Sequence, residues 1–222
     1  MQFCLLDLDG TLIDTEELIR LALKYAAREA LGVELTDAQV AERRGMPLVR
    51  ALDSLDPTRR EELWRHYNVF VFENHDRLAR PFPGTVEVLE ALKERGVRLA
   101  LVTSKRQVTA RLALDQFQLW PYFDYMVFGD STEKNKPHPE PVYAALEGLG
   151  AAEPGKALMV GDTPYDIMAA RAAGTRAGAA LFDASVDEEA LLALKPDYAF
   201  YRPADLLQVF PPEFAKYNVL KE

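Results

Sequence analysis

The chain has 222 residues, of which 49% are hydrophobic and 27% are charged, and its formal net charge is −9. This composition is typical of a globular protein with one large domain, or one domain plus an insert, and the acidic balance argues against a nucleic-acid partner. No apolar run approaches the roughly 20 residues of a membrane span, and a lone cysteine (Cys4) without a preceding signal peptide leads us to expect a cytoplasmic protein.

The chain opens with a short apolar strand, residues 3–6, that runs directly into Asp7, Asp9 and Gly10. Side chains alternate along a strand, so Asp7 and Asp9 begin on the same side, at the mouth of the expected sheet. Burying a carboxylate is costly unless it is paired or bound to a metal, and Gly10 allows a sharp turn or the close approach of a ligand. An ordinary turn is the simpler explanation of this segment when it is taken alone.

Residues 16–80 show helical periodicity without strands. A first helix is expected over residues 18–26 with a stop at Gly32, a helix start at residues 36–39, a short helix over residues 48–55 and a long aromatic-rich helix over residues 58–78. Pro81 to Gly84 then mark a change of pattern. We therefore expect a helical cap domain, residues 16–80, inserted into a core domain formed by residues 1–15 and 81–222.

From residue 85 onward, short apolar strands alternate with helices. Strands are expected at residues 97–102, 125–128, 157–160, 176–181 and 198–200, with helices at residues 85–95, 107–115, 140–149, 165–173 and 187–194. This alternation predicts an α/β fold, with a Rossmann-like parallel sheet covered by helices on both faces.

Polar side chains follow several of these strands, at the edge where parallel sheets bind ligands. Thr103 and Ser104 follow one strand, Asp162 follows another, Asp166 lies one helical turn later, and Lys136 precedes a helix between two prolines. Each has a structural explanation as a helix cap, a helix-terminal acid or a surface lysine. Together they suit a phosphate site. Converging carboxylates repel by roughly 4 kcal/mol at ~4 Å, and Mg²⁺, which prefers oxygen ligands, would relieve that repulsion.

In this order, the clusters resemble the four motifs of the haloacid dehalogenase superfamily of phosphohydrolases. Asp7-Leu8-Asp9-Gly10-Thr11 is similar to its first motif, Ser104 (or Thr103) to its second, Lys136 to its third, and Gly161-Asp162 with Asp166 to its fourth. The resemblance covers nearly the whole chain, and the insert over residues 16–80 matches the helical cap that this family places after its first motif.

The resemblance implies a division of labour among the core residues. Asp7 is expected to attack phosphorus as the nucleophile, and Asp9 to act first as general acid and then as general base. Mg²⁺ is expected to be held by the carboxylates of Asp7 and Asp162 and by the backbone carbonyl of Asp9, with Asp166 supporting a metal-bound water. Asp9 also argues against dehalogenation, because members that cleave carbon–halogen bonds lack this acid.

The phosphoryl group is expected to be bound by the polar groups at the strand ends. The resemblance implies that Ser104, with Thr103 and Gly10, contacts phosphoryl oxygens. Lys136 is expected to neutralise charge on the phosphoryl group and on Asp7, so that catalysis rests mainly on positioning and electrostatics.

Substrate selection is expected to lie in the cap, where Arg43, Arg44 and Gly45 occupy a loop that relatives use to read their substrates. An arginine there suits a second anionic group, although solvation of a helix end explains both arginines equally well. The segment around His66 and His75 resembles the phosphoglycolate phosphatase and pyrophosphatase-like branch.

We therefore expect a phosphatase for a small phosphorylated metabolite, of the phosphoglycolate phosphatase type, present as a monomer or homodimer. The alternatives are pyrophosphate hydrolysis, a phosphotransfer like that of β-phosphoglucomutase, and a non-catalytic phosphate-binding protein. A protein that only binds phosphate would have no use for Asp9 as an acid.

Overall fold

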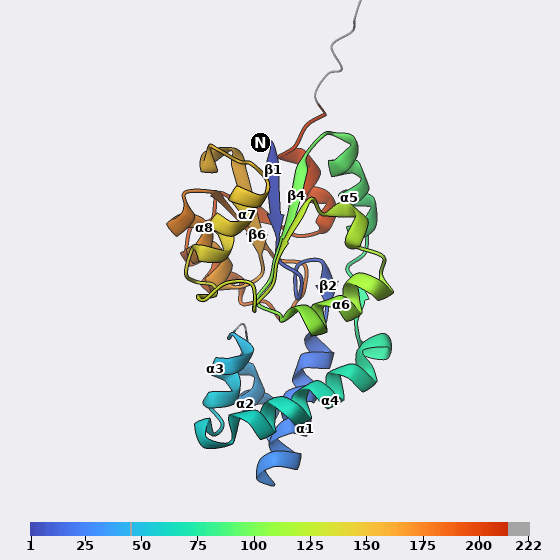
Figure 1. Ribbon diagram of the computed structural model, residues 1–222, viewed down its shortest axis with the longest axis vertical. Helices are drawn as coiled ribbons and strands as arrows, with labels where there is room; N and C mark the ends of the chain where they lie inside the picture. Colours follow the sequence, from blue (N-terminus) through green and yellow to red (C-terminus); the bar gives the residue numbers. More distant parts are fainter. Residues whose placement is uncertain (45, 213–222) are drawn as a thin grey trace, which may run out of the picture.

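The computed structural model describes residues 1–44 and 46–212. Figure 1 shows an α/β core that carries both the first strand and the last described residues, and a separate group of helices below it. The core strands are β1 (Phe3–Leu6), β4 (Arg98–Val102), β5 (Tyr125–Val127), β6 (Ala157–Gly161), β7 (Arg176–Ala180) and β8 (Tyr198–Phe200). The core helices are α5 (Thr85–Glu94), α6 (Gln107–Gln116), α7 (Glu140–Gly148), α8 (Pro164–Ala173) and α9 (Glu188–Ala193), with short 3-10 turns η2 (Trp120–Tyr122), η3 (Pro154–Lys156) and η4 (Pro203–Gln208).

The six core strands form one parallel sheet in the order β5-β4-β1-β6-β7-β8. The first strand of the chain therefore lies in the middle, where Leu5 pairs with Ala100 of β4 and with Met159 of β6. This register brings the carboxyl ends of β1, β4 and β6 side by side. The predicted α/β fold with a parallel sheet is confirmed.

Helices cover both faces of the sheet and form two apolar cores. Leu6 and Leu101 face one core with α5, α6 and η4, whereas Leu5 and Ala100 face the other with α7, α8 and α9. Successive strand residues thus enter opposite cores, and both faces of the central strands are buried. This arrangement explains why the strands read as continuous apolar runs in the sequence.

The segment between the first strand and the rest of the core is helical and has an apolar core of its own. It contains α1 (Glu16–Leu31), α2 (Asp37–Ala41), α3 (Leu48–Asp53), η1 (Pro57–Arg59) and α4 (Arg60–Leu78). Helix α1 ends at Gly32, which has a φ of +68°, and α2 begins with a capping box between Thr36 and Gln39. Leu18, Leu52 and Leu63 are among the buried residues that hold these helices together.

Two short strands join this helical segment to the core. β2 (Ile13–Asp14) and β3 (Arg80–Pro81) pair in antiparallel fashion, so the chain enters and leaves the helical segment at one place. Gly84 occupies the N-cap position of α5, directly before Thr85. The Thr85 hydroxyl donates to the carbonyl of Leu12 at 3.1 Å and ties α5 to the entry side of this connection.

Among the described residues, none of the helices combines the length and the apolar character that a bilayer crossing would need.

Candidate active site

The ends of three neighbouring strands bring the predicted core residues to one edge of the sheet. Asp7 follows β1, Thr103 follows β4 and Asp162 follows β6. The backbone N–H of Asp7 donates to the carbonyl of Val160 at 3.0 Å, which fixes the end of β1 against β6. The site therefore lies at the carboxyl ends of central strands of the sheet, and Asp7, Thr103 and Asp162 directly follow these strands.

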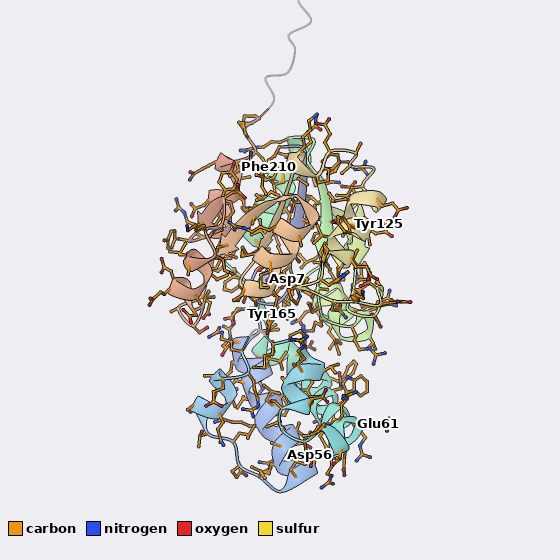
Figure 2. The ribbon with its side chains drawn as sticks, turned by 90° about the vertical axis from the view of Figure 1, so that its left-hand side faces the viewer. Asp7, Asp56, Glu61, Tyr125, Tyr165 and Phe210 are labelled. Carbon is orange, nitrogen blue, oxygen red and sulfur yellow. The ribbon has the colours of Figure 1, made fainter. Side chains whose placement is uncertain are left out.

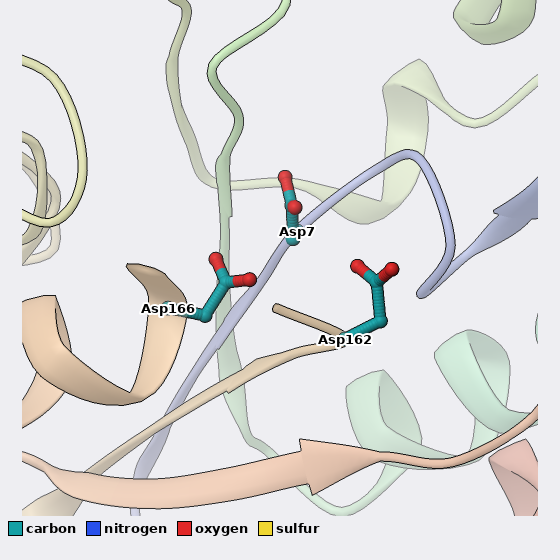
Figure 3. A group of neighbouring side chains, drawn as sticks. All are labelled: Asp7, Asp162 and Asp166. Carbon is teal, nitrogen blue, oxygen red and sulfur yellow. The ribbon is translucent and has the colours of Figure 1, made fainter. Parts of the chain in front are cut away.

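Three carboxylates converge at this edge, as Figure 3 shows for Asp7, Asp162 and Asp166. One oxygen atom from each side chain lies within 4.8 Å of those from the other two. Asp166 is fully buried, and its Oδ2 accepts hydrogen bonds from the backbone N–H and the hydroxyl of Thr163 at 3.1 and 2.6 Å. The hydroxyl of Thr11 donates to Asp162 Oδ1 over a long 3.5 Å.

Lys136 is the cation of this cluster and is only 3% exposed. Its Nζ donates to Asp166 Oδ1 at 2.6 Å and to the carbonyl of Val102 at 2.9 Å. The same nitrogen lies 3.1 Å from Asp7 Oδ1, an ion-pair distance. The buried Oδ1 of Asp7 nevertheless makes no hydrogen bond of good geometry with a described residue. The lysine is thus held by three neighbours and placed directly beside Asp7.

Burial and neighbouring charges shift the pKa values of Asp7, Asp162 and Lys136. The pKa of Asp7 is raised to about 7, chiefly by burial and also by Asp166, although Lys136 acts to lower it. Burial, followed by Asp166 and Asp7, also raises the pKa of Asp162 well above its usual range. Burial alone would lower the pKa of Lys136, but Asp166 and Asp7 raise it above its ordinary value.

This donor set fits a divalent cation. When all four groups are ionised, three carboxylates against one ammonium leave two negative charges at the site, and Asp7 Oδ1 is buried without a hydrogen bond to any described residue. Hard oxygen ligands of this kind suit Mg²⁺, which shares its shell with water and substrate phosphate. We conclude that Asp7, Asp162 and Asp166 are residues that could hold such an ion.

Two glycines make room for the carboxylates. A Cβ atom at Gly10, where φ is +75°, would lie 2.2 Å from Asp162 Oδ2, and one at Gly161 would lie 2.1 Å from Asp166 Cγ. The sequence suggested a turn or a close approach at Gly10, and the structure shows both. Any larger residue at these two positions would displace a carboxylate.

Asp9 faces a different set of partners from Asp7. Its carboxylate forms an ion pair with Lys105, at 2.8 and 3.1 Å from Nζ to the two oxygens, and accepts a hydrogen bond of 2.8 Å from Thr15. It is not one of the three clustered carboxylates. Lys105 follows Ser104 directly, and no pattern in the sequence indicates that its side chain reaches Asp9 rather than solvent.

Thr103 and Ser104 lie beside this pair, at the end of β4. Thr103 is 3% exposed, and its hydroxyl accepts a hydrogen bond of 3.1 Å from the backbone N–H of Lys105. Both residues line the same cavity as Asp7 and Lys136. The residues expected to bind an anion after this strand therefore lie on the same cavity as the carboxylates.

A cavity of about 480 Å³ separates the carboxylates from the helical segment. Figure 2 places Asp7 and Tyr165 where the core faces the helices, and Asp56 and Glu61 at the far side of the helical segment. The volume suits a small metabolite. Thus Asp7, Asp9, Thr103, Ser104, Lys136 and Asp162 meet around one space, together with Gly10.

The residues expected to select the substrate have different surroundings. Arg43 and Arg44 both line the cavity, but Arg44 is engaged by Glu16 at 3.0 Å and by Ser185. Gly45 lies outside the described residues. His75 is buried against Gln116, with 2.8 Å between Nδ1 and Oε1, and it is not among the described residues that line the cavity.

The fold and the site define a hydrolase with a Rossmann-like core and a helical segment that covers the cavity of the active site. The family model of haloacid dehalogenase-like hydrolases matches residues 4–180. The chain belongs to this family, and it is a phosphatase.

Relatives and solved structures agree with this assignment. The chain is 40% identical over 92% of both chains to a candidate pyrophosphatase PpaX of Caldanaerobacter subterraneus subsp. tengcongensis. It is 34% identical to the pyrophosphatase PpaX of Bacillus pumilus, over 92% of this chain and 94% of the relative. A crystal structure described as a predicted phosphoglycolate phosphatase, from Haemophilus somnus, aligns with a TM-score of 0.81 and 26% identity, over 95% of this chain and 98% of that one.

Proposed function

We propose that this phosphatase depends on Mg²⁺ and hydrolyses a small anionic phosphate compound through an aspartyl-phosphate on Asp7. The observation that carries the proposal is the cluster of Asp7, Asp162 and Asp166, with Lys136 paired to Asp7 and Asp166, whose members Asp7, Asp162 and Lys136 line a cavity of about 480 Å³. A buried carboxylate beside a lysine and at the mouth of a cavity is placed to attack an entering phosphoryl group.

The reaction divides between the two aspartates of the first motif. A carboxylate oxygen of Asp7 attacks phosphorus, and the bond from phosphorus to the leaving oxygen breaks as Asp9 gives that oxygen a proton. Asp9 then takes a proton from the water that cleaves the aspartyl-phosphate, which restores Asp7 and releases phosphate. Lys136 and the end of β4 at Thr103 and Ser104 balance the phosphoryl charge.

Mg²⁺ would be held by the carboxylates of Asp7 and Asp162 and by the backbone carbonyl of Asp9, with Asp166 close by. When bound, it supplies positive charge against the phosphoryl oxygens. The excess of two negative charges in the cluster supports this role.

The substrate we favour is pyrophosphate, because both relatives described above carry the name pyrophosphatase PpaX at 34% and 40% identity. Phosphoglycolate is the second candidate, supported by the similar solved structure of 26% identity. We further propose that the enzyme works in the cytosol, which its single, buried and unpaired cysteine supports.

Replacing Asp7 tests the nucleophile. We expect Asp7→Asn to lower kcat for p-nitrophenyl phosphate and for pyrophosphate at least about 10³-fold, because the amide cannot form the aspartyl-phosphate. Asp56→Asn is the matched control, since Asp56 lies on the far side of the helical segment (Figure 2) and caps η1. Wild-type turnover by Asp7→Asn would refute the assignment of the nucleophile.

A further inference from the structure

Lys105 carries a charge that the cluster of three carboxylates does not engage. Lys136 pairs with Asp7 and Asp166, whereas the only ion pair of Lys105 among the described residues is with Asp9. Both lysines line the same cavity. The two aspartates of the first motif therefore each have a lysine of their own, and the part that Lys105 plays in the reaction is still to be assigned.

The backbone around Lys105 is held on two sides. Its N–H donates to the hydroxyl of Thr103 at 3.1 Å, and its carbonyl accepts a hydrogen bond of 2.9 Å from the N–H of Gly129, shortly after β5. A Cβ atom at Gly129 would lie 2.2 Å from the carbonyl oxygen of Ser104, so this close contact needs a glycine. Lysine side chains are flexible, but this one starts from a fixed backbone and is only 11% exposed.

The carboxylate of Asp9 has partners on both of its oxygens. Oδ1 accepts hydrogen bonds from the Thr15 hydroxyl and from Lys105 Nζ, both at 2.8 Å, and Oδ2 accepts one from the same Nζ at 3.1 Å. Thr15, between β2 and α1, is 1% exposed. A carboxylate oxygen offers about two lone pairs. Within the described part of the chain, Oδ1 is thus fully engaged, whereas Oδ2 keeps one lone pair.

Proton transfer by Asp9 depends on the direction in which its carboxyl group points. The last torsion of an aspartate side chain is broad, so a carboxyl group without partners samples many directions. A general acid must lie within hydrogen-bond reach of the atom that takes its proton, and a misplacement of about 1 Å can cost about 10²-fold in rate. Lys105 on one side and Thr15 on the other hold this carboxyl group in one orientation.

We propose that Lys105 is a positioning residue, which orients Asp9 so that Oδ2 is the oxygen that exchanges the proton. The inference rests on the proposed function, in which Asp9 is the general acid and base, and deepens it. Oδ2 gives its proton to the leaving oxygen as the bond from that oxygen to phosphorus breaks. Oδ2 then takes a proton from the water that cleaves the aspartyl-phosphate. Lys105 keeps its own protons in both steps and acts only through Asp9.

The dependence of the rate on the leaving group tests this role. Phenyl phosphate and p-nitrophenyl phosphate are similar in shape, but phenolate is the stronger base and therefore needs the proton from Asp9 more. The ratio kcat/KM covers the steps up to release of the phenol. We expect Lys105→Met to lower kcat/KM for phenyl phosphate about 10- to 100-fold, and for p-nitrophenyl phosphate less than about threefold, because general acid catalysis contributes about 10²–10⁴-fold.

Two further variants separate orientation from other effects of the charge. Lys105→Arg should recover part of the loss on phenyl phosphate, since a guanidinium can again bond to both oxygens of Asp9. Lys93→Met is the matched control, because it removes an ion pair of 3.0 Å with Asp124 outside the cavity lining, and it should leave both rates unchanged. An equal loss on both substrates in Lys105→Met would indicate that Lys105 binds the phosphoryl group itself, and would overturn the proposal.

A double-mutant cycle shows whether Lys105 acts through Asp9. In the Asp9→Asn background the carboxyl group that Lys105 orients is absent. Adding Lys105→Met to that background should therefore change kcat/KM for phenyl phosphate by less than about twofold. If the two substitutions instead lowered kcat/KM independently, so that their factors multiplied, Lys105 would have a role of its own and the proposal would be wrong.

The same variants keep this inference distinct from the proposed function. If Asp9→Asn left kcat/KM for phenyl phosphate unchanged, the assignment of the general acid would fail. If Asp9→Asn lowered it and Lys105→Met did not, only the positioning role would fail. A crystal structure of Lys105→Met decides the orientation without turnover: a rotated or disordered Asp9 carboxyl group supports the role, and an unchanged one rejects it.

Discussion

At the scale of residues, the site depends on carboxylates packed more closely than their charges favour. Asp7 and Asp166 share Lys136, Asp162 lies beside them, and the pKa values of Asp7 and Asp162 are raised, chiefly by burial. The surrounding backbone must therefore hold them in place against their mutual repulsion. Gly10 and Gly161 contribute by having no side chain at the points of closest approach.

The first prediction concerns Gly10→Ala. The new methyl group would lie 2.2 Å from Asp162 Oδ2, so Asp162 must move away. If Asp162 binds Mg²⁺ as proposed, the rise in Tm on adding Mg²⁺ should shrink or vanish, and kcat should fall at least about tenfold because the proposed metal ligand is displaced. Thermal unfolding with and without Mg²⁺ and EDTA, together with aryl-phosphate turnover, measures both effects.

Gly32→Ala is the control for this substitution. Gly32 also has a positive φ, +68°, but a Cβ atom added there would meet no described atom within 4 Å. Both variants share a strain of about 1–2 kcal/mol for a side chain in the left-handed region, and only Gly10→Ala adds the clash. An unchanged response to Mg²⁺ in Gly10→Ala would show that Asp162 does not bind the metal.

The sequence was sufficient to place the main members of the site, because parallel strands end at one edge of a sheet. Asp7, Thr103 and Asp162 could be assigned to that edge from apolar runs alone. The ion pair between Lys105 and Asp9 could not, since it depends on which way a long side chain turns. The engagement of Arg44 by Glu16 and Ser185 likewise depends on tertiary contacts, which no local pattern records.

At the scale of elements, helix α4 joins the helical segment to the core through α6. His75, near the end of α4, is 1% exposed and pairs with Gln116 of α6, while its ring packs near Phe117. The sequence predicted the long helix over residues 58–78, which the structure shows as η1 followed by α4. The contact with α6 could not be predicted in the same way, because the helix crossing is set by tertiary packing.

The second prediction is an acid sensitivity at this contact. Burial lowers the pKa of His75, and Lys105 lowers it further, whereas Gln116, Asp9 and Asp76 act in the opposite direction. The unfolded chain, with a histidine pKa of about 6.5, therefore binds the proton more readily than the folded one. The free energy of unfolding should fall as the pH drops below about 6.5.

His75→Gln removes the titrating group and can keep a hydrogen bond to Gln116. We expect the loss of Tm between pH 7 and pH 5.5 to be smaller in His75→Gln than in the wild type. His66→Gln is the matched control, because His66 lies beside Arg65 on the same helix. Identical pH profiles for wild type and His75→Gln would exclude a contribution from this histidine.

At the scale of the whole molecule, the helical segment and the core meet on both sides of the cavity. On one side Arg44 reaches from the turn after α2 to Ser185 in the loop after β7. On the other, the guanidinium of Arg106, at the start of α6, lies 5.3 Å from the centre of the Trp64 ring of α4. Paired strands β2 and β3 carry the two chain connections between them.

The last prediction is that Arg44→Gln loosens this closure. Arg44 and its partner Glu16 are both partly exposed, so their ion pair is worth about 1 kcal/mol or less. Removing it should shift the ratio of closed to open molecules by roughly two- to fivefold. We expect KM to rise by a similar factor for every substrate, and the radius of gyration from small-angle scattering to increase. The Arg65 side chain is 65% exposed, and its only ion pair among the described residues is with Glu62 at 4.0 Å, so Arg65→Gln should change neither quantity. A KM increase confined to acidic substrates would instead mean that Arg44 binds the substrate itself.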